Sequence, residues 1–245
     1  MNVTICAVPF SFVKGDNIRQ RNAIGSWLRL DPKPEIILLG DDEGVPEFAK
    51  SRGFQHIGSI RKTKLGHMDC SDIFQKMQEA ASHDVVLYMD CDTILLSSFL
   101  PVLKFVSTHY NPFMMVGGRW SIPTPAKVWD FKNPVWEEEA IATIKRHVCH
   151  GSDYYSFPKG FITEMPDFSM GRGHWDGWVM RYPLDRGAEL VRADLVTKTL
   201  HQDHGPRTPR GAGSGWQRNL RLCGGKEGQR WASDATVVLK PGDLK

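Results

Sequence analysis

The sequence has little cysteine and no long apolar run. Its 245 residues include five cysteines, an odd number, widely spaced and without a C-x-x-C pair. This spacing favours reduced thiols over a disulfide framework and forms no cysteine zinc site. Residues 1–13 are apolar but lack a basic leader and a small-residue cleavage site, so we interpret them as a first strand and expect a cytoplasmic protein. No apolar stretch approaches the roughly 18 residues of a transmembrane segment, although contact with a membrane surface stays open.

A strong excess of one charge is also missing. The formal net charge is +3, and 24% of residues are charged against 41% hydrophobic. Such a composition is typical of a globular chain, and the small positive excess argues against nucleic-acid binding. The phosphate-loop motif G-x-x-x-x-G-K-[ST], the G-x-S-x-G elbow and the H-E-x-x-H zinc motif are absent as well. The chemistry of those three motifs is therefore set aside.

Short apolar runs alternate with helical patterns through the first hundred residues. This alternation is typical of an α/β protein, in which helices cover a parallel sheet. We predict strands at 3–8, 35–39, 55–60, 85–89 and 113–116. We predict helices at 17–30, 71–81 and 175–182, with Ser71 as the cap of the second. A further helix is predicted to begin at Pro134, with Ile141, Ile144 and Val148 on one face. After a mobile loop at 205–215, a last helix is predicted from Trp216 onward, capped by Ser214.

The clearest chemical signal is a pair of acids at the end of an apolar strand. The run 85–89 is followed directly by Asp90-Cys91-Asp92. In an open parallel sheet, ligands bind at the carboxyl ends of the strands. Carboxylate oxygens suit Mg²⁺ or Mn²⁺, which in turn neutralise a diphosphate. The sequence therefore predicts a divalent-cation site at this edge, and the alternative is that the two acids only cap a turn.

This D-x-D, in its place after the strand, resembles the hallmark of GT-A nucleotide-sugar glycosyltransferases, especially family-2-like enzymes. The resemblance implies a Rossmann-like three-layer sandwich with a central mixed, mostly parallel sheet. It implies that Asp90 lies near the ribose and that Asp92 binds a metal between the two phosphates, so both are metal candidates. It also implies one compact domain, with a nucleotide-sugar-binding half at 1–118 and an acceptor-binding, catalytic half at 119–245.

Other segments match the donor site of that family. Two acids close the second predicted strand, where the family places a contact to uracil or ribose. The loop after the first strand matches the segment that holds the base, with Phe10 or Phe12 able to stack on it. Basic residues after the third strand and in the C-terminal loop are placed to bind a diphosphate. The nucleotide-binding candidates are Pro9, Phe10, Asp41, Asp42, Lys64, Asp90, Arg207 and Arg210.

Two further segments match the metal and acceptor sites. Many GT-A enzymes complete the metal site with a C-terminal histidine, for which His201 and His204 are the candidates. The segment 171–178 resembles the one that holds the catalytic base, which implies that Asp176 deprotonates the acceptor hydroxyl. Trp175 and Trp178 beside it are the acceptor-binding candidates, and the alternative is that both belong to the core.

The resemblance thus implies a metal-dependent glycosyltransferase. We expect transfer of a hexosyl or pentosyl group from a nucleotide diphosphate donor, a UDP-sugar, to a saccharide or other hydroxyl acceptor with inversion, and a retaining route is the rival. A sugar-nucleotide nucleotidyltransferase would need a glycine-rich loop after the first strand, where Gly15 is the one glycine. A non-catalytic sugar-binding module would explain the aromatic residues but not the placing of the D-x-D.

Overall fold

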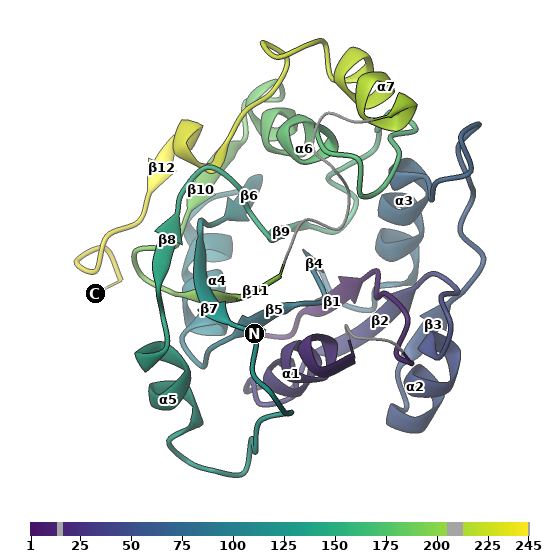
Figure 1. Ribbon diagram of the computed structural model, residues 1–245. Helices are drawn as coiled ribbons and strands as arrows, with labels where there is room; N and C mark the ends of the chain where they lie inside the picture. Colours follow the sequence, from purple (N-terminus) through teal and green to yellow (C-terminus); the bar gives the residue numbers. More distant parts are fainter. Residues whose placement is uncertain (14–16, 205–212, 245) are drawn as a thin grey trace.

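A twisted eight-stranded sheet forms the centre of the molecule (Figure 1). The computed structural model describes residues 1–13, 17–204 and 213–244. Among these, the strands follow the order β12-β10-β6-β9-β4-β1-β2-β3, and every pairing is parallel except those of β9 with β4 and β6. The strands are β1 (Thr4–Ala7), β2 (Glu35–Leu39), β3 (Gln55–Ile57), β4 (Val85–Met89), β6 (Phe113–Val116), β9 (Tyr154–Pro158), β10 (Glu189–Arg192) and β12 (Val237–Val238).

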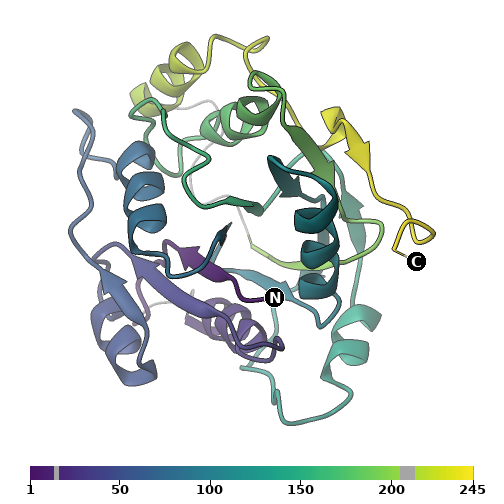
Figure 2. The ribbon, with the colours of Figure 1, turned by 180° about the vertical axis from the view of Figure 1, so that it is seen from behind.

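Helices cover both faces of this sheet and give the predicted three layers (Figures 1 and 2). On one face the core includes Trp27 of α1, Phe48 of α2 and Leu103 of α4. On the other face it includes Phe74 of α3 and Val179 of α6. The helices are α1 (Asn17–Trp27), α2 (Val45–Arg52), α3 (Cys70–Ala80), α4 (Phe99–His109), α5 (Trp136–Ala142), α6 (Trp175–Leu184) and α7 (Ser214–Leu222), with a 3₁₀ turn at Ala232–Asp234.

A second, four-stranded sheet joins segments that are far apart in the chain. Its order is β5-β11-β7-β8, made of β5 (Thr93–Leu95), β7 (Arg119–Pro123), β8 (Arg146–Val148) and β11 (Thr199–Asp203). β11 runs antiparallel to β5, and this register sets His201 opposite Thr93. A small core under α5, with Trp136 and Ala140, supports the sheet. The second sheet therefore brings the C-terminal half to the end of β4.

Several local predictions differ from the structure. Asp69, and not Ser71, caps α3, because its carboxylate accepts the Ser71 amide at 2.8 Å. The helix after Pro134 ends at Ala142, and Val148 lies in β8, paired with Arg119. Gly213, and not Ser214, is the residue before α7, and no side chain caps that helix. The strand predicted at 55–60 ends at Ile57. Helix caps depend on backbone angles that the hydrophobic pattern does not fix.

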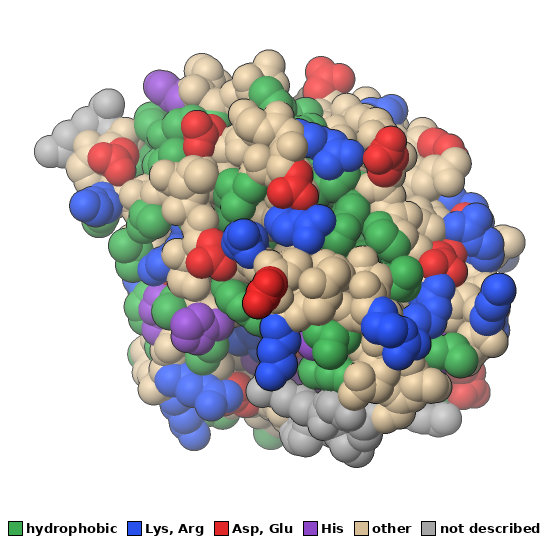
Figure 3. Space-filling view, turned by 90° about the horizontal axis from the view of Figure 1, so that it is seen from above, with side chains coloured by type: hydrophobic (Ala, Val, Ile, Leu, Met, Phe, Trp, Pro, Cys, Tyr) green, Lys and Arg blue, Asp and Glu red, His purple; other side chains and the backbone are tan. Residues whose placement is uncertain are grey.

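The strands predicted at 35–39, 85–89 and 113–116 are confirmed with the same bounds. The predicted C-terminal loop lies mostly outside the described residues. None of the helices within the described ranges has the length and apolar character needed to cross a bilayer. Acidic and basic side chains are interspersed over the face seen from above (Figure 3), consistent with the net charge of +3.

Candidate active site

The D-x-D forms the turn between β4 and β5. The Asp90 amide donates to the Asp153 carbonyl at 2.8 Å, and the Thr93 amide donates to the Asp90 carbonyl at 3.1 Å. The side chain of Gln202 on β11 donates to the Asp92 carbonyl at 2.9 Å. These bonds hold the turn in one shape, so that Asp92 is buried while Asp90 stays partly open to a cavity.

Two histidines converge on Asp92. His204 Nε2 lies 3.0 Å from Asp92 Oδ2, and His201 Nδ1 lies 3.7 Å from Asp92 Oδ1. The three side chains can offer one ligand atom each, and these atoms lie within 4.8 Å of one another. One carboxylate and two imidazoles at this spacing are a donor set that a divalent transition metal accepts. Within the described residues, Asp90 is not a member of this group.

Asp153 is a site residue that the sequence analysis missed. It is buried, with Oδ1 at 2.6 Å from an Arg119 guanidinium nitrogen and Oδ2 at 3.1 Å from His201 Nδ1. It immediately precedes β9, the one antiparallel strand of the main sheet, so the start of β9 meets the carboxyl end of β4. In the sequence, Asp153 is recognisable only as an acid that precedes an aromatic-rich strand. To place it in the site one must know that this strand runs antiparallel, and the sequence pattern does not reveal strand direction.

The charges in this cluster shift each other's titration. Burial, together with the neighbouring Asp153 and Asp92, raises the pKa of Asp90 well above its ordinary range. Burial also raises the pKa of Asp153, but Arg119 and His201 outweigh it and hold that pKa below the ordinary range. Burial lowers the pKa of His201, but Asp153 and Asp92 outweigh it, so the net shift is upward. The cluster thus combines closely spaced acids with a half-buried arginine and a buried histidine.

A cavity of about 610 Å³ opens beside this cluster. Its wall includes Asp90, Arg119 and His204, together with Trp175 and Asp176. The rest of the wall comes from the ends of β1 and β2, the loop before α3 and the segment before α6; among its residues are Pro9, Phe10, Asp41, Asp42, Lys62, His67, Gly171 and Arg172. The cavity therefore joins the predicted donor residues to the predicted base.

Asp176 lies in the first turn of α6, facing the cavity. Its Oδ1 is buried and has no hydrogen-bond partner among the described residues. Burial raises the pKa of Asp176, against the opposing effect of the Gly177 amide. The residue before the helix, His174, has φ 66°, and its Nδ1 lies 2.8 Å from Gln229 Oε1. His174 thus has the left-handed backbone conformation, and it directs the chain into α6 at the cavity wall.

The other predicted residues lie in different surroundings. Phe10 is 41% exposed and lines the cavity, whereas Phe12 is buried and stacks on Phe48 at 4.1 Å, in the core. Trp175 is buried and lines the cavity, and its ring makes a T-shaped contact with Tyr88, with the ring centroids 5.5 Å apart. Trp178 lines a separate surface groove between α3 and α6, and Lys64 is exposed and lines neither. Arg207 and Arg210 lie outside the described residues.

Comparison with known proteins gives similarity in structure only. No protein-family model matches the chain, and a search of curated proteins finds no match. A solved structure of GalNAc-T7 with UDP, GalNAc and Mn²⁺ is similar at a TM-score of 0.60 with 12% identity, covering 91% of this chain and 48% of that one. A structure of S. aureus TarS residues 1–349 with UDP-GlcNAc is similar at a TM-score of 0.59 with 10% identity, covering 91% of this chain and 65% of that one.

These two chains are longer than this one, which spans about half to two thirds of their length. The identities are low, so the comparison concerns the fold. Both similarities extend over 91% of the chain. The chain has the GT-A glycosyltransferase fold, as its sequence predicts.

Proposed function

We propose that the protein is a metal-dependent glycosyltransferase that uses a nucleotide diphosphate sugar, with a UDP-sugar as the expected donor. The observation that carries the proposal is the meeting of Asp92, His201 and His204 at the carboxyl end of β4, beside a cavity that also holds Asp176. The fold supports it, since the two similar structures were solved with UDP or UDP-GlcNAc. The cavity volume of about 610 Å³ suits a ligand of nucleotide-sugar size.

The residues present fit a resident divalent cation. Imidazole nitrogens suit Mn²⁺ better than Mg²⁺, which prefers an all-oxygen octahedron, so we propose Mn²⁺. His201 Nδ1 lies 3.1 Å from Asp153 Oδ2, so this buried acid orients the imidazole beside Asp92 and His204. Asp92, His201 and His204 would hold the cation, which would supply positive charge to neutralise the leaving diphosphate.

The protein's own groups account for the remaining steps. Asp41 or Asp42 and Phe10 hold the nucleoside at the ends of β1 and β2. Asp90 lies on the cavity wall next to the metal group and is placed to contact the ribose. Asp176 accepts the proton of the acceptor hydroxyl as that oxygen attacks the anomeric carbon, which gives inversion if it lies on the face opposite the leaving group. Trp175 shields this step from water.

The test is binding and turnover with defined donors. Isothermal titration with UDP, UDP-glucose and UDP-N-acetylglucosamine, with Mn²⁺ or with chelator, measures donor affinity. We expect Mn²⁺-dependent binding of UDP and slow hydrolysis of one UDP-sugar. Guanosine and cytidine diphosphates serve as matched controls for the base. Absence of metal-dependent binding for every nucleotide would refute the proposed function.

A further inference from the structure

The cavity wall carries two cations that lack an acidic partner. Arg119 also lines the cavity, but its guanidinium is paired with Asp153 at 2.6 Å. Lys62 and Arg172 line the same cavity, and among the described residues neither takes part in an ion pair. Arg172 is half-buried, and a partly enclosed cation is normally paired, because leaving water costs free energy that a counter-charge must offset. For Arg172 that counter-charge is therefore expected from a ligand. Lys62 is exposed and adds a second positive charge on the same cavity wall.

A histidine orients the Arg172 guanidinium. Arg172 Nε donates to His67 Nε2 at 3.1 Å, and within the described residues this is the only hydrogen bond of that side chain. Burial, with a smaller effect of the Arg172 charge, lowers the pKa of His67, so the neutral ring that this bond requires is favoured. One N–H of the guanidinium is thus used for orientation. The two terminal nitrogens remain for an oxyanion, to which a guanidinium binds with two parallel hydrogen bonds.

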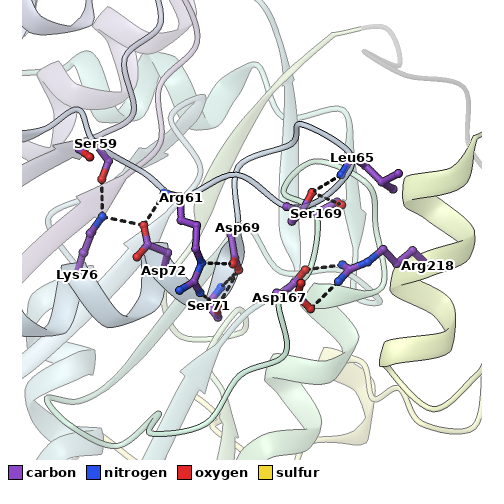
Figure 4. A network of polar contacts seen from close by, with 11 residues as sticks. Ser59, Arg61, Leu65, Asp69, Ser71, Asp72, Lys76, Asp167, Ser169 and Arg218 are labelled. Carbon is purple, nitrogen blue, oxygen red and sulfur yellow. Dashed lines mark hydrogen bonds and ion pairs between the residues drawn. The ribbon is translucent and has the colours of Figure 1, made fainter.

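Lys62 is carried by a hairpin that is fixed at its base. The Thr63 amide donates to the His67 carbonyl at 2.8 Å, and Lys62 is bridged to Met68. At the base, Arg61 Nε binds Asp69 Oδ2 at 2.8 Å, and the Arg61 amide donates to Asp72 Oδ2 at 2.7 Å. Figure 4 shows these side chains converging on the start of α3. The hairpin is therefore held against α3 at the point where it enters the cavity wall.

The segment before α6, which carries Arg172, is fixed in the same region. Asp69 is bridged to Ser169, and the Met170 amide donates to the Met68 carbonyl at 2.9 Å. On the other side, Arg218 of α7 pairs with Asp167, as Figure 4 shows. Gly215 at the start of α7 packs so closely that an added Cβ would lie 3.0 Å from both Arg172 and His67. Lys62 and Arg172 thus lie on two neighbouring segments that are hydrogen-bonded to each other.

From this arrangement we infer that Lys62 and Arg172 form an oxyanion clamp that binds a phosphate or carboxylate group of the substrate. The inference rests on the proposed function and deepens it, since neither residue belongs to the metal group. Two substrates can supply such a group: the diphosphate of the donor, or an acidic group on the acceptor. The shared chemistry is an oxyanion with two acceptor oxygens, and binding experiments distinguish the two sources.

The first experiment tests the donor. UDP and uridine are titrated, with Mn²⁺ present, into the wild-type protein and into Arg172→Gln and Lys62→Gln. If the clamp holds the diphosphate, we expect each variant to weaken UDP binding roughly tenfold or more, as for a lost charge-assisted hydrogen bond, with uridine binding unchanged. Lys50→Gln, which removes an exposed charge from α2 outside the cavity, is the matched control and is expected to bind UDP as the wild type does.

The second experiment tests the acceptor. Inorganic phosphate is titrated, by ³¹P NMR line broadening, into protein already saturated with UDP and Mn²⁺. If the clamp receives an acidic acceptor group, the wild type still binds phosphate, and Arg172→Gln and Lys62→Gln lose this binding while their UDP affinity is normal. Arg172→Lys keeps the positive charge but not the planar guanidinium that forms two parallel hydrogen bonds. This variant is expected to retain part of the phosphate binding. Circular dichroism and melting curves establish that each variant is folded.

Equal affinities of wild type and both variants for UDP and for phosphate would overturn the clamp while leaving the proposed function intact. A wild-type protein that binds no nucleotide would overturn the proposed function instead. In that case phosphate is titrated into the unliganded protein. Loss of its binding in Arg172→Gln would support the clamp independently of the donor, and unchanged binding would overturn it.

Discussion

Two carboxylates at the cavity, Asp92 and Asp176, have different partners and therefore different chemistry. Asp92 is buried beside the two imidazoles of the metal group. Asp176 is half-buried at the start of α6, and one of its oxygens has no hydrogen bond among the described residues. Charged ligands stabilise a cation, whereas an isolated, partly buried carboxylate binds a proton more readily. The two residues are thus suited to different roles, and each role can be tested by one substitution to asparagine.

Asp92→Asn replaces a charged ligand by a neutral amide of the same size. We expect Mn²⁺ affinity to fall at least about tenfold and metal-dependent donor turnover to be nearly abolished, because the ligand charge that attracts the cation is lost. Affinity is measured by electron paramagnetic resonance of free Mn²⁺. Asp84→Asn, at the exposed opposite end of β4, is the control. Wild-type Mn²⁺ affinity in Asp92→Asn would contradict the metal assignment.

Asp176→Asn removes the proposed base. Loss of a general base costs about a hundredfold to ten-thousandfold in rate, so single-turnover transfer should fall by that order while donor affinity is retained. In the wild type, the base must be ionised, and its raised pKa means that the rate falls as pH drops through a value above the usual range near 4. This acid limb should be missing from any residual activity of the variant. If transfer survives, Glu164 and Asp167 are the next carboxylates to test.

Asp176→Asn is expected to lower the transfer rate but to increase the stability of the fold at neutral pH. Because the folded-state pKa of Asp176 is raised, protonation stabilises the fold, and that stabilisation is lost as pH rises through the folded pKa. A permanently neutral asparagine avoids this loss. We therefore expect Asp176→Asn to melt at a higher temperature than the wild type at pH 7 and at a similar one at pH 3. A lower melting temperature at pH 7 would instead indicate a structural acid that stabilises the helix start.

At the scale of elements, α7 holds the segment before α6 through one buried side chain. Asn219 Oδ1 accepts the Ser169 amide at 2.9 Å, and its Nδ2 donates to the carbonyls of Ser169 and Gly173, both at 2.9 Å. The segment from 169 to 173 includes Arg172, so the position of one wall of the cavity depends on a helix from the end of the chain. The hydrophobic pattern of the sequence predicts none of these three hydrogen bonds.

Asn219→Ala should therefore loosen this wall. Three hydrogen bonds at a net of about 0.5–1.5 kcal/mol each give an expected loss of about 1.5–4.5 kcal/mol in the free energy of unfolding. Urea unfolding measures that loss, and hydrogen exchange at the Ser169 amide should become faster. Gln217→Ala, on the exposed side of α7, is the control and should change stability by less than about 0.5 kcal/mol. Unchanged exchange at Ser169 in Asn219→Ala would show that α7 does not fix the segment.

At the scale of the whole molecule, the proposed metal links the two halves of the chain, because Asp92 comes from the first half and both histidines from the second. Ligands that bind only the folded state stabilise it, by about 2.7 kcal/mol at a concentration of one hundred times Kd. We expect UDP and Mn²⁺ together to raise the melting temperature by more than the sum of their separate effects. By reciprocity, UDP must then raise Mn²⁺ affinity by the same factor as Mn²⁺ raises UDP affinity. Strictly additive shifts would indicate independent sites.

The sequence by itself determined the fold class and the first half of the site. Apolar runs such as 85–89 mark buried strands wherever they occur, and a parallel sheet places the residue after each run at one edge. Asp90, Asp92 and the acids after β2 were therefore predictable as neighbours. The predicted base segment also reached the cavity, since Asp176 lines it together with Asp90. In these cases local pattern and tertiary position agree.

Only the tertiary structure decided which side chains complete the site. His201 meets Asp92 through the register of β11 with β5, over more than a hundred residues of sequence separation. Asp153 reaches the cluster because β9 runs antiparallel, and Arg172 is aimed by His67, from a distant loop. Strand order, direction and register follow from packing of the whole chain, and a one-residue slip of β11 against β5 would turn His201 to the other face of its sheet. A single sequence records which residues are present but leaves these non-local pairings open.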